Sequence, residues 1–170
     1  TEHQGKEICF SSNEDTLTIT DVTNKAAPLL IARESYQGAS YSHQGWLTED
    51  QHYFLMDDEA DEGGGAMTAT YIWDLTNLDD PINSGTFMGT TTAIDHNQYV
   101  KGDYSYQANY RAGLRILDIG NIENAQLSEF GYFDIYPSSN TANFNGAWST
   151  YPYFASGNVL VSGIEQGLLV

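Results

Sequence analysis

The sequence contains a single cysteine, Cys9, and only six basic residues against 23 acidic ones. One cysteine cannot form a disulfide within the chain, so the cysteine count does not identify a redox compartment. Cys9 lies in the alternating segment Glu7–Ser12, where we expect a small buried side chain. No hydrophobic run approaches the roughly 18 residues that a membrane-spanning helix requires, so direct membrane insertion is not expected.

The scarcity of positive charge excludes further classes of partner. The formal net charge is −17, whereas nucleic-acid binding requires clustered lysine and arginine side chains that neutralise phosphates. An anionic membrane surface is disfavoured for the same reason. A strongly acidic surface instead suits a marine, halophilic or extracellular setting, or one that is rich in divalent cations. The alternative interpretation is that the charge only maintains solubility.

The residues that are abundant indicate an all-β protein. Twelve tyrosines and sixteen glycines supply aromatic side chains that favour strands and small residues that favour turns. No stretch places apolar residues at the 3.6-residue spacing of an amphipathic helix.

Three segments repeat one pattern, an apolar strand that ends in aspartate and is followed by a turn rich in Asn, Asp or Pro. The segments are Leu17–Leu30, Thr70–Asn83 and Leu114–Leu127. Their aspartates are Asp21, Asp74 and Asp118, separated by 53 and then 44 residues. Each is expected to accept a hydrogen bond from an amide of the following turn. A period of this length, with about four short strands in each period, predicts a β-propeller-like array of four-stranded antiparallel blades.

The repeats describe a single domain whose approximate units are 1–38, 39–91, 92–142 and 143–170. The first unit is expected to begin at its second strand and the last to stop at its third, which amounts to somewhat over three blades. Because a closed propeller needs at least about four blades, we interpret the chain as part of a ring. The missing blades would come from a longer polypeptide or from another chain, or the open edges would stay exposed.

The repeated phrases resemble a known family. LTITDVTN, YIWDLTN and LRILDIGN resemble LVIVD repeats. SHQGWLTEDQHYFLMDDE, DHNQYVKGDYSYQANYRAGLRILDI and FNGAWSTYPYFASGNVLVSGIEQGLLV resemble the secreted bacterial proteins called choice-of-anchor B. The resemblance implies a β-propeller-like domain that is exported and attached to the bacterial cell surface. It implies no particular activity, because the family has no settled one.

Equivalent positions on successive inner strands are candidates for a binding site, because the inner strands of a propeller surround its central channel. His43, His96 and Asn145 occupy such positions, and Asp95 precedes His96. Imidazole and carboxylate groups gathered at a channel mouth bind a metal or an anion, or titrate near neutral pH. The alternative interpretation is that these side chains only hydrogen-bond neighbouring backbone.

The acidic insertion 57–65 is a second candidate. Its five carboxylates belong to Asp57, Asp58, Glu59, Asp61 and Glu62. Crowded carboxylates repel one another unless a cation or water separates them, and hard oxygen ligands favour calcium. The spacing is not that of an EF-hand, because the sixth position is Glu62 instead of glycine and the twelfth is Thr68 instead of glutamate. Two interpretations stay open, a calcium-binding loop and a solvated acidic loop.

No catalytic residue is assigned, because the sequence has no GxSxG, HExxH or phosphate-binding glycine motif. The favoured function is an extracellular or cell-surface propeller module that binds a protein or a polysaccharide and is stabilised by calcium. One alternative is a hydrolase or lyase that acts at the channel mouth through His43, His96 and neighbouring acids. Another is a structural subunit of a larger surface assembly. Trp46, Tyr99 and Trp148 are expected to pack between blades, the alternative role being sugar stacking.

Overall fold

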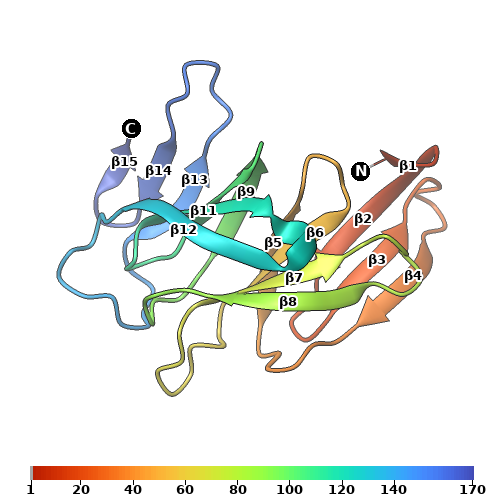
Figure 1. Cartoon of the computed structure of the whole chain (residues 1–170), viewed down its shortest axis with the longest axis horizontal. Coiled ribbons are helices and arrows are strands. Elements are labelled where there is room, and N and C mark those ends of the chain that lie inside the picture. The colour runs from red at the N-terminus through yellow and green to blue at the C-terminus, as the bar shows by residue number, and fades with distance from the viewer. Residues whose placement is uncertain (1) are drawn as a thin grey trace.

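The structure, a computed structural model, describes residues 2–170, and these residues form four antiparallel sheets. The sheets follow one another across the molecule in chain order, from the N-terminal sheet on the right of Figure 1 to the C-terminal sheet on the left. Within each sheet the strands are also hydrogen-bonded in chain order. No α-helix occurs between residues 2 and 170, and no helix there is long and apolar enough to cross a membrane.

Each sheet is a meander of short strands. The first consists of β1 (Glu2–His3), β2 (Lys6–Ser12), β3 (Leu17–Asp21) and β4 (Leu29–Glu34). The second consists of β5 (Ser42–Leu47), β6 (Tyr53–Asp58), β7 (Ala69–Asp74) and β8 (Ile82–Met88). The third consists of β9 (Asn97–Lys101), β10 (Tyr104–Ala108), β11 (Leu114–Asn121) and β12 (Gln126–Phe133), with a 3-10 turn η1 (Ile122–Asn124). The fourth consists of β13 (Ala147–Tyr151), β14 (Leu160–Gly163) and β15 (Gly167–Leu169).

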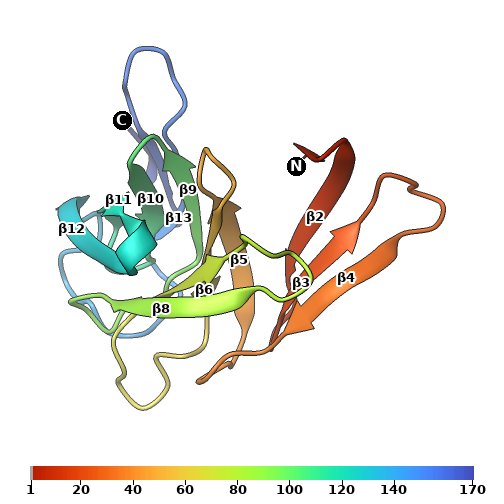
Figure 2. The same cartoon turned by 45° about the vertical axis from the view of Figure 1, so that its right-hand side comes forward.

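The predicted array of antiparallel blades is confirmed. The one difference in strand content is at the start, where the two-residue β1 pairs with β2 as an inner strand that the sequence did not predict. The views in Figures 1 and 2 both place the first and last sheets at opposite sides of the molecule. The sheets therefore form an arc, and the inner strands β5, β9 and β13 lie next to one another along it.

The middle strands of the second sheet contain runs of consecutive apolar residues because both of their faces are covered. Alternate side chains of a strand point to opposite faces, so Phe54 and Met56 of β6 pack toward the first sheet while Leu55 packs toward the third. Trp73 and Ile72 of β7 divide in the same way. The runs FLM and YIW thus supply side chains to two cores at once, which explains why these strands lack the polar alternation of a half-exposed sheet.

In the first sheet, Cys9 of β2 is exposed to solvent. On β2 the buried residue is Ile8, and Cys9 next to it points to the solvent. The expectation of a buried cysteine was wrong, because the alternation on this strand places the even-numbered residue in the core.

The three repeated aspartates hold the turns that follow them, as predicted. Oδ1 of Asp21 accepts a hydrogen bond from the amide of Thr23, and Asp74 and Asp118 bind the amides two residues further on in the same way. Each aspartate thereby satisfies a backbone donor where the strand gives way to the turn.

A side chain joins the second sheet to the third. Gln44 of β5 accepts a hydrogen bond from the amide of Gln98 at 2.8 Å and donates one to the carbonyl oxygen of the same residue at 3.0 Å. The amide side chain thus pairs with β9 as a neighbouring strand would. This pairing sets the position of the start of β5 against the start of β9.

Gly113 provides a test of this packing. Its φ is +73°, and a Cβ at this position would overlap the carbonyl oxygen of Phe133. We expect Gly113→Ala to lower the free energy of unfolding by about 1–3 kcal/mol more than Gly102→Ala. Gly102 is a matched control, because it also has a positive φ, +57°, but no atom near the added Cβ. Urea unfolding measures the difference, and equal losses in the two variants would contradict the predicted overlap.

Candidate functional site

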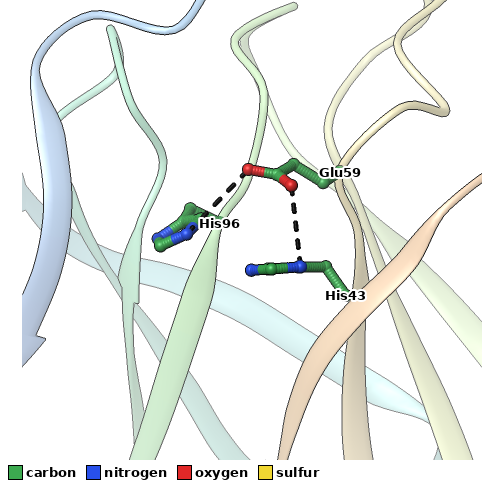
Figure 3. Close-up of side chains that lie close together, drawn as sticks. All are labelled: His43, Glu59 and His96. Atoms are coloured by element: carbon green, nitrogen blue, oxygen red, sulfur yellow. Dashed lines mark ion pairs between the residues drawn. The ribbon is translucent and has the colours of Figure 1, made fainter. Parts of the chain in front are cut away.

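His43, Glu59 and His96 come together although they are far apart in the sequence (Figure 3). Nδ1 of His43 is 3.6 Å from Oε2 of Glu59, and Nε2 of His96 is 3.9 Å from Oε1 of Glu59. The two imidazole rings stack with centroids 4.9 Å apart. Within residues 2–170 this is the one group of three ligating side chains whose atoms all lie within 4.8 Å of one another.

A β-bulge directs His43 into this group. Ser42 pairs with Asp58 and Gln44 with Asp57, so His43 is the extra residue between two consecutive pairs. Bulges re-aim one side chain and occur frequently beside functional sites. Glu59 follows the end of β6, and His96 precedes β9, with its amide bound to the carbonyl oxygen of Ala108.

Glu59 is held in place by Tyr110. The Tyr110 hydroxyl donates a hydrogen bond of 2.6 Å to Oε1 of Glu59. Burial, and then this bond to Glu59, raise the pKa of Tyr110, so the hydroxyl remains the donor. The backbone of Tyr110 has a φ of 33°, a region that bulky residues rarely adopt. Strain of this kind persists where the surrounding structure enforces it, and it is frequent at functional sites.

His96 is oriented by the backbone of the fourth sheet. Its Nδ1 lies within hydrogen-bonding distance of the carbonyl oxygen of Trp148. Nδ1 also lies 3.0 Å from Nδ2 of Asn97, which can only donate, so its two contacts favour opposite tautomers. The tautomer that donates to the carbonyl carries the proton on Nδ1 and turns the lone pair of Nε2 of the neutral ring toward Glu59. Burial lowers the pKa of His96, which favours this neutral form. Sequence reasoning assigned no role here to Tyr110 or to the carbonyl of Trp148, because neither contact leaves a motif.

Asn145 does not join the two histidines. Its side chain accepts hydrogen bonds from Arg111 and donates one to Glu165. The bulge of β13 falls at Trp148, between the pairs of Ala147 and Ser149, and the Trp148 ring lies 4.4 Å from the ring of His96. Trp148, the bulged residue of β13, is therefore the residue of the fourth sheet that reaches the histidines. The expectation that Asn145 lies with His43 and His96 was wrong, because the bulge of β13 falls at Trp148 and not at Asn145.

The acidic insertion is not a solvated loop. Asp57, Asp58 and Glu62 are buried, Glu59 and Asp61 are half-buried, and Ala60 and residues 63–67 are exposed. Asp58 is fully engaged, since it accepts hydrogen bonds from the hydroxyl of Tyr36 and from the amides of Ser40, Tyr41 and Ala60. Asp58 thus holds the connection between the first two sheets.

The remaining acids form a buried group. Within the described part of the chain, neither carboxylate oxygen of Asp95 has a hydrogen-bond partner, and neither Oδ2 of Asp57 nor Oε2 of Glu62 has one. Desolvation, followed by repulsion among the group, raises the pKa of Asp57 and of Asp95. Desolvation likewise raises the pKa of Asp61 to about 6 and that of Glu62 to about 8. Asp95, expected at the channel mouth, therefore belongs to this acidic group instead of the histidine group.

Polar side chains continue from the acids into the space between the second and third sheets. Gln98 donates to Oδ1 of Asp57 and accepts from Ser105, while Gln107 donates to Thr70. All are buried. This network was not predicted, because polar residues on an alternating strand usually face water.

An aromatic row lies further along the same inner strands. Trp46 contacts Tyr99 at 4.9 Å and Tyr153 at 6.4 Å between ring centroids, and Tyr153 continues to Tyr151 at 5.5 Å. Blade-to-blade packing of Trp46 and Tyr99 is thus confirmed. Trp46, Tyr151 and Tyr153 are nevertheless exposed, and Trp46 and Tyr153 line a groove of about 580 Å³ that extends to Phe10 of the first sheet.

Residues 97–131 match the family model of the LVIVD repeat. The match covers the third sheet from β9 into β12, including the LRILD strand, and is less than half of the chain. No curated protein sequence matches this chain.

Solved structures with the same arrangement of sheets are β-propeller proteins. A protein from Lactobacillus plantarum has a TM-score of 0.73 at 15% identity, covering 95% of this chain and 48% of its own. The periplasmic gluconolactonase of Pseudomonas aeruginosa has a TM-score of 0.71 at 16% identity, covering 98% and 50%. The β-propeller domain of Cps50 (Swd1) from Myceliophteria thermophila has a TM-score of 0.57 at 12% identity, covering 96% and 50%. The chain has a propeller-type fold and spans about half the length of these relatives.

The buried acids predict an unusual dependence of stability on pH. The pKa of Glu62 rises from 4.5 to about 8 on folding, so between these values the folded state binds more protons than the unfolded state. Stability contributed by protonated Glu62 is fully present below pH 4.5 and is lost as the pH rises through 8. In metal-free buffer, we expect Glu62→Gln to melt above the unsubstituted protein at pH 8, with the difference vanishing near pH 4.5.

Thermal melts from pH 4.5 to 9 measure this effect. The exposed Glu34 supplies the control, since Glu34→Gln removes one carboxylate from the sequence, as Glu62→Gln does, without altering the buried group. If the two variants shift the melting temperature alike at pH 8, burial of Glu62 is not the cause.

Proposed function

We propose that this chain is part of an exported, cell-surface propeller that binds a neutral polysaccharide. The observation that carries the proposal is the aromatic row of Trp46, Tyr99, Tyr151 and Tyr153, together with the groove beside it. Tyr99 is half-buried, and the other three rings are exposed. Ligand sites are concave and largely apolar, with a few polar groups that orient the ligand. In this groove Glu49 and Gln51 supply such groups next to Trp46.

The charge of the chain selects among polysaccharides. At a net charge of −17 the surface repels polyanions over distances of about a Debye length. Neutral sugars escape this repulsion, and their apolar faces can stack on exposed aromatic rings. A protein ligand is the alternative that the same surface allows.

The proposed export and surface attachment are supported by the resemblance of the sequence phrases to choice-of-anchor B proteins, and they suit the acidic surface. We propose that the arc is completed by further blades, in the same polypeptide or in a neighbouring chain. The span of about half of each solved relative supports this arrangement. Further blades would pack against the first and last sheets, whose outer sides have no neighbouring sheet within residues 2–170.

Calcium is proposed as a stabilising ion at the buried acids Asp57, Glu62 and Asp95. Their unpartnered oxygens are of the type that calcium prefers. Binding requires the three side chains to turn toward one another, because their oxygens are not gathered within 4.8 Å as those of the histidine group are. Asp58 and Glu59 are not part of this set, since their oxygens are engaged elsewhere.

The calcium proposal has a direct measurement. At pH 8 we expect added Ca²⁺ to raise the melting temperature of the chelator-treated protein, because the ion replaces protons among the acids. Asp95→Asn should abolish the rise, whereas Asp103→Asn, on the β9–β10 turn, should leave it intact. An identical melting temperature with Ca²⁺ and with chelator contradicts the proposal.

A second candidate function is hydrolysis at the channel mouth, which the approach of His43, His96 and Glu59 favours. A carboxylate and an imidazole within reach of one another can share proton transfer to a bound ester or lactone. The gluconolactonase among the solved structures shares its fold with this chain, and that likeness of fold is the whole of its support for this class of reaction.

Replacing Trp46 tests the polysaccharide proposal. Loss of an aromatic anchor from a binding site costs about 2 kcal/mol, or about thirtyfold in affinity, so we expect Trp46→Ala to weaken binding by that factor. The measurement is affinity electrophoresis against panels of neutral and acidic polysaccharides. Phe130→Ala is the control, because Phe130 is an exposed aromatic residue of the outer strand β12. Absence of binding to every neutral polysaccharide, or equal losses in both variants, contradicts the proposal.

A further inference from the structure

We propose that His43, Glu59 and His96 form a site for a divalent transition metal of the zinc class. The proposal is independent of polysaccharide binding, because it uses a different set of residues. Two imidazole nitrogens and one carboxylate oxygen suit zinc and related ions, whereas calcium and magnesium prefer oxygen ligands alone. Three protein ligands with a fourth position open to water or substrate is the arrangement of catalytic zinc sites, including sets of two histidines and one glutamate.

The distances are close to those that coordination requires. Ligands about 2.0–2.1 Å from a tetrahedral zinc ion lie about 3.3–3.4 Å apart. The separations from Glu59 oxygens are 3.6 Å to Nδ1 of His43 and 3.9 Å to Nε2 of His96. The two distances end on different oxygens of Glu59 (Figure 3), and the ligand atoms of the three side chains lie within 4.8 Å of one another. Coordination therefore requires the stacked imidazole rings to turn until a nitrogen of each points at the same ion as the carboxylate.

The tautomer of His96 that donates to the Trp148 carbonyl favours a cation between His96 and Glu59. With the proton on Nδ1, held by the carbonyl of Trp148, the lone pair of Nε2 faces the carboxylate of Glu59. Two acceptors that face each other repel unless a cation or proton lies between them. The amide of Asn97 also donates to the carbonyl of Trp148, at 3.1 Å, so the backbone acceptor is itself held in place.

The surrounding contacts resemble the outer shell of a metal site. Metal-binding histidines usually donate their second nitrogen to a backbone carbonyl or carboxylate, and metal-binding carboxylates are themselves hydrogen-bonded. His96 satisfies the first condition through Trp148, and Glu59 the second through Tyr110. Tyr110 and Trp148 are therefore positioning residues of the proposed site.

The fourth coordination position faces the solvent on the side of His43. The side chain of His43 is 35% exposed, against 8% for His96 and 13% for Glu59. A metal ion can thus enter past His43, and a water molecule or an oxygen of a ligand can reach it from the same side.

The test uses the untagged chain after removal of metal with a chelator. Calorimetric titration with Zn²⁺ is expected to show one saturable equivalent, and Co²⁺ should give the visible absorption of a low-coordinate site. His43→Ala is expected to abolish binding and, because His43 lies at the surface, to leave the fold intact by circular dichroism. Tyr110→Phe, which removes only the hydroxyl that orients Glu59, should weaken Zn²⁺ binding about tenfold to hundredfold.

The control protein carries His3→Ala and His52→Ala, which removes the other two histidines. It should bind Zn²⁺ as the unsubstituted chain does. The proposal is overturned if Zn²⁺ shows no saturable binding, if His43→Ala binds equally well, if only the control loses binding, or if Ca²⁺ competes at equal concentration.

Discussion

The pairing of the Gln44 side chain with the backbone of Gln98 is the contact on which the centre of the molecule depends. Neighbouring sheets of a propeller diverge, so their inner strands cannot share a continuous ladder. If the backbone N–H and C=O of Gln98 had no partners, each would lower the free energy of unfolding by about 1–3 kcal/mol. The primary amide of Gln44 matches both groups of Gln98. It thereby places the bulge at His43 opposite the beginning of β9, where His96 lies.

The polar interior between the second and third sheets is the second constraint. Asp57, Gln98 and Ser105 are connected by hydrogen bonds and are fully shielded from water. A buried polar network specifies one arrangement strongly when all of its members are satisfied, and it is costly when some are not. Asp95 and Glu62 have oxygens that lack partners within residues 2–170. Protonation or a bound cation would therefore stabilise these buried carboxylates. The fold tolerates them because apolar clusters pack on both sides of the second sheet.

The histidine group and the acidic group are adjacent but chemically distinct. Glu59 separates from the other acids of its segment because the chain turns at the end of β6, and Tyr110 then draws its carboxylate toward His96. The segment 57–62 thus distributes its acids among three environments. Asp58 holds a chain connection, Asp57 and Glu62 enter the buried acidic group, and Glu59 faces the imidazoles.

Much of the architecture could be predicted from the repeats. The apolar strands that end in Asp21, Asp74 and Asp118 indicated the blades and their turns, because strand periodicity and turn chemistry are local properties of the chain. The nearness of His43 and His96 also followed from their common place in the repeat. Asn145 did not follow, because repeat spacing assumes regular pairing and the bulge of β13 falls at Trp148 instead.

The sequence alone therefore determined a β-propeller-type array and its strand order, since these depend on strand periodicity and turn residues. Only the tertiary structure decided which acids are buried, that Glu59 and not Asn145 joins the histidines, and that Tyr110 holds it there. Those outcomes depend on bulges, on a backbone in the left-handed region and on side-chain bonds between sheets. Such features depend on which residues meet in the folded chain, as Glu59 and Tyr110 do although they are 51 positions apart, and these contacts leave no pattern in a single sequence.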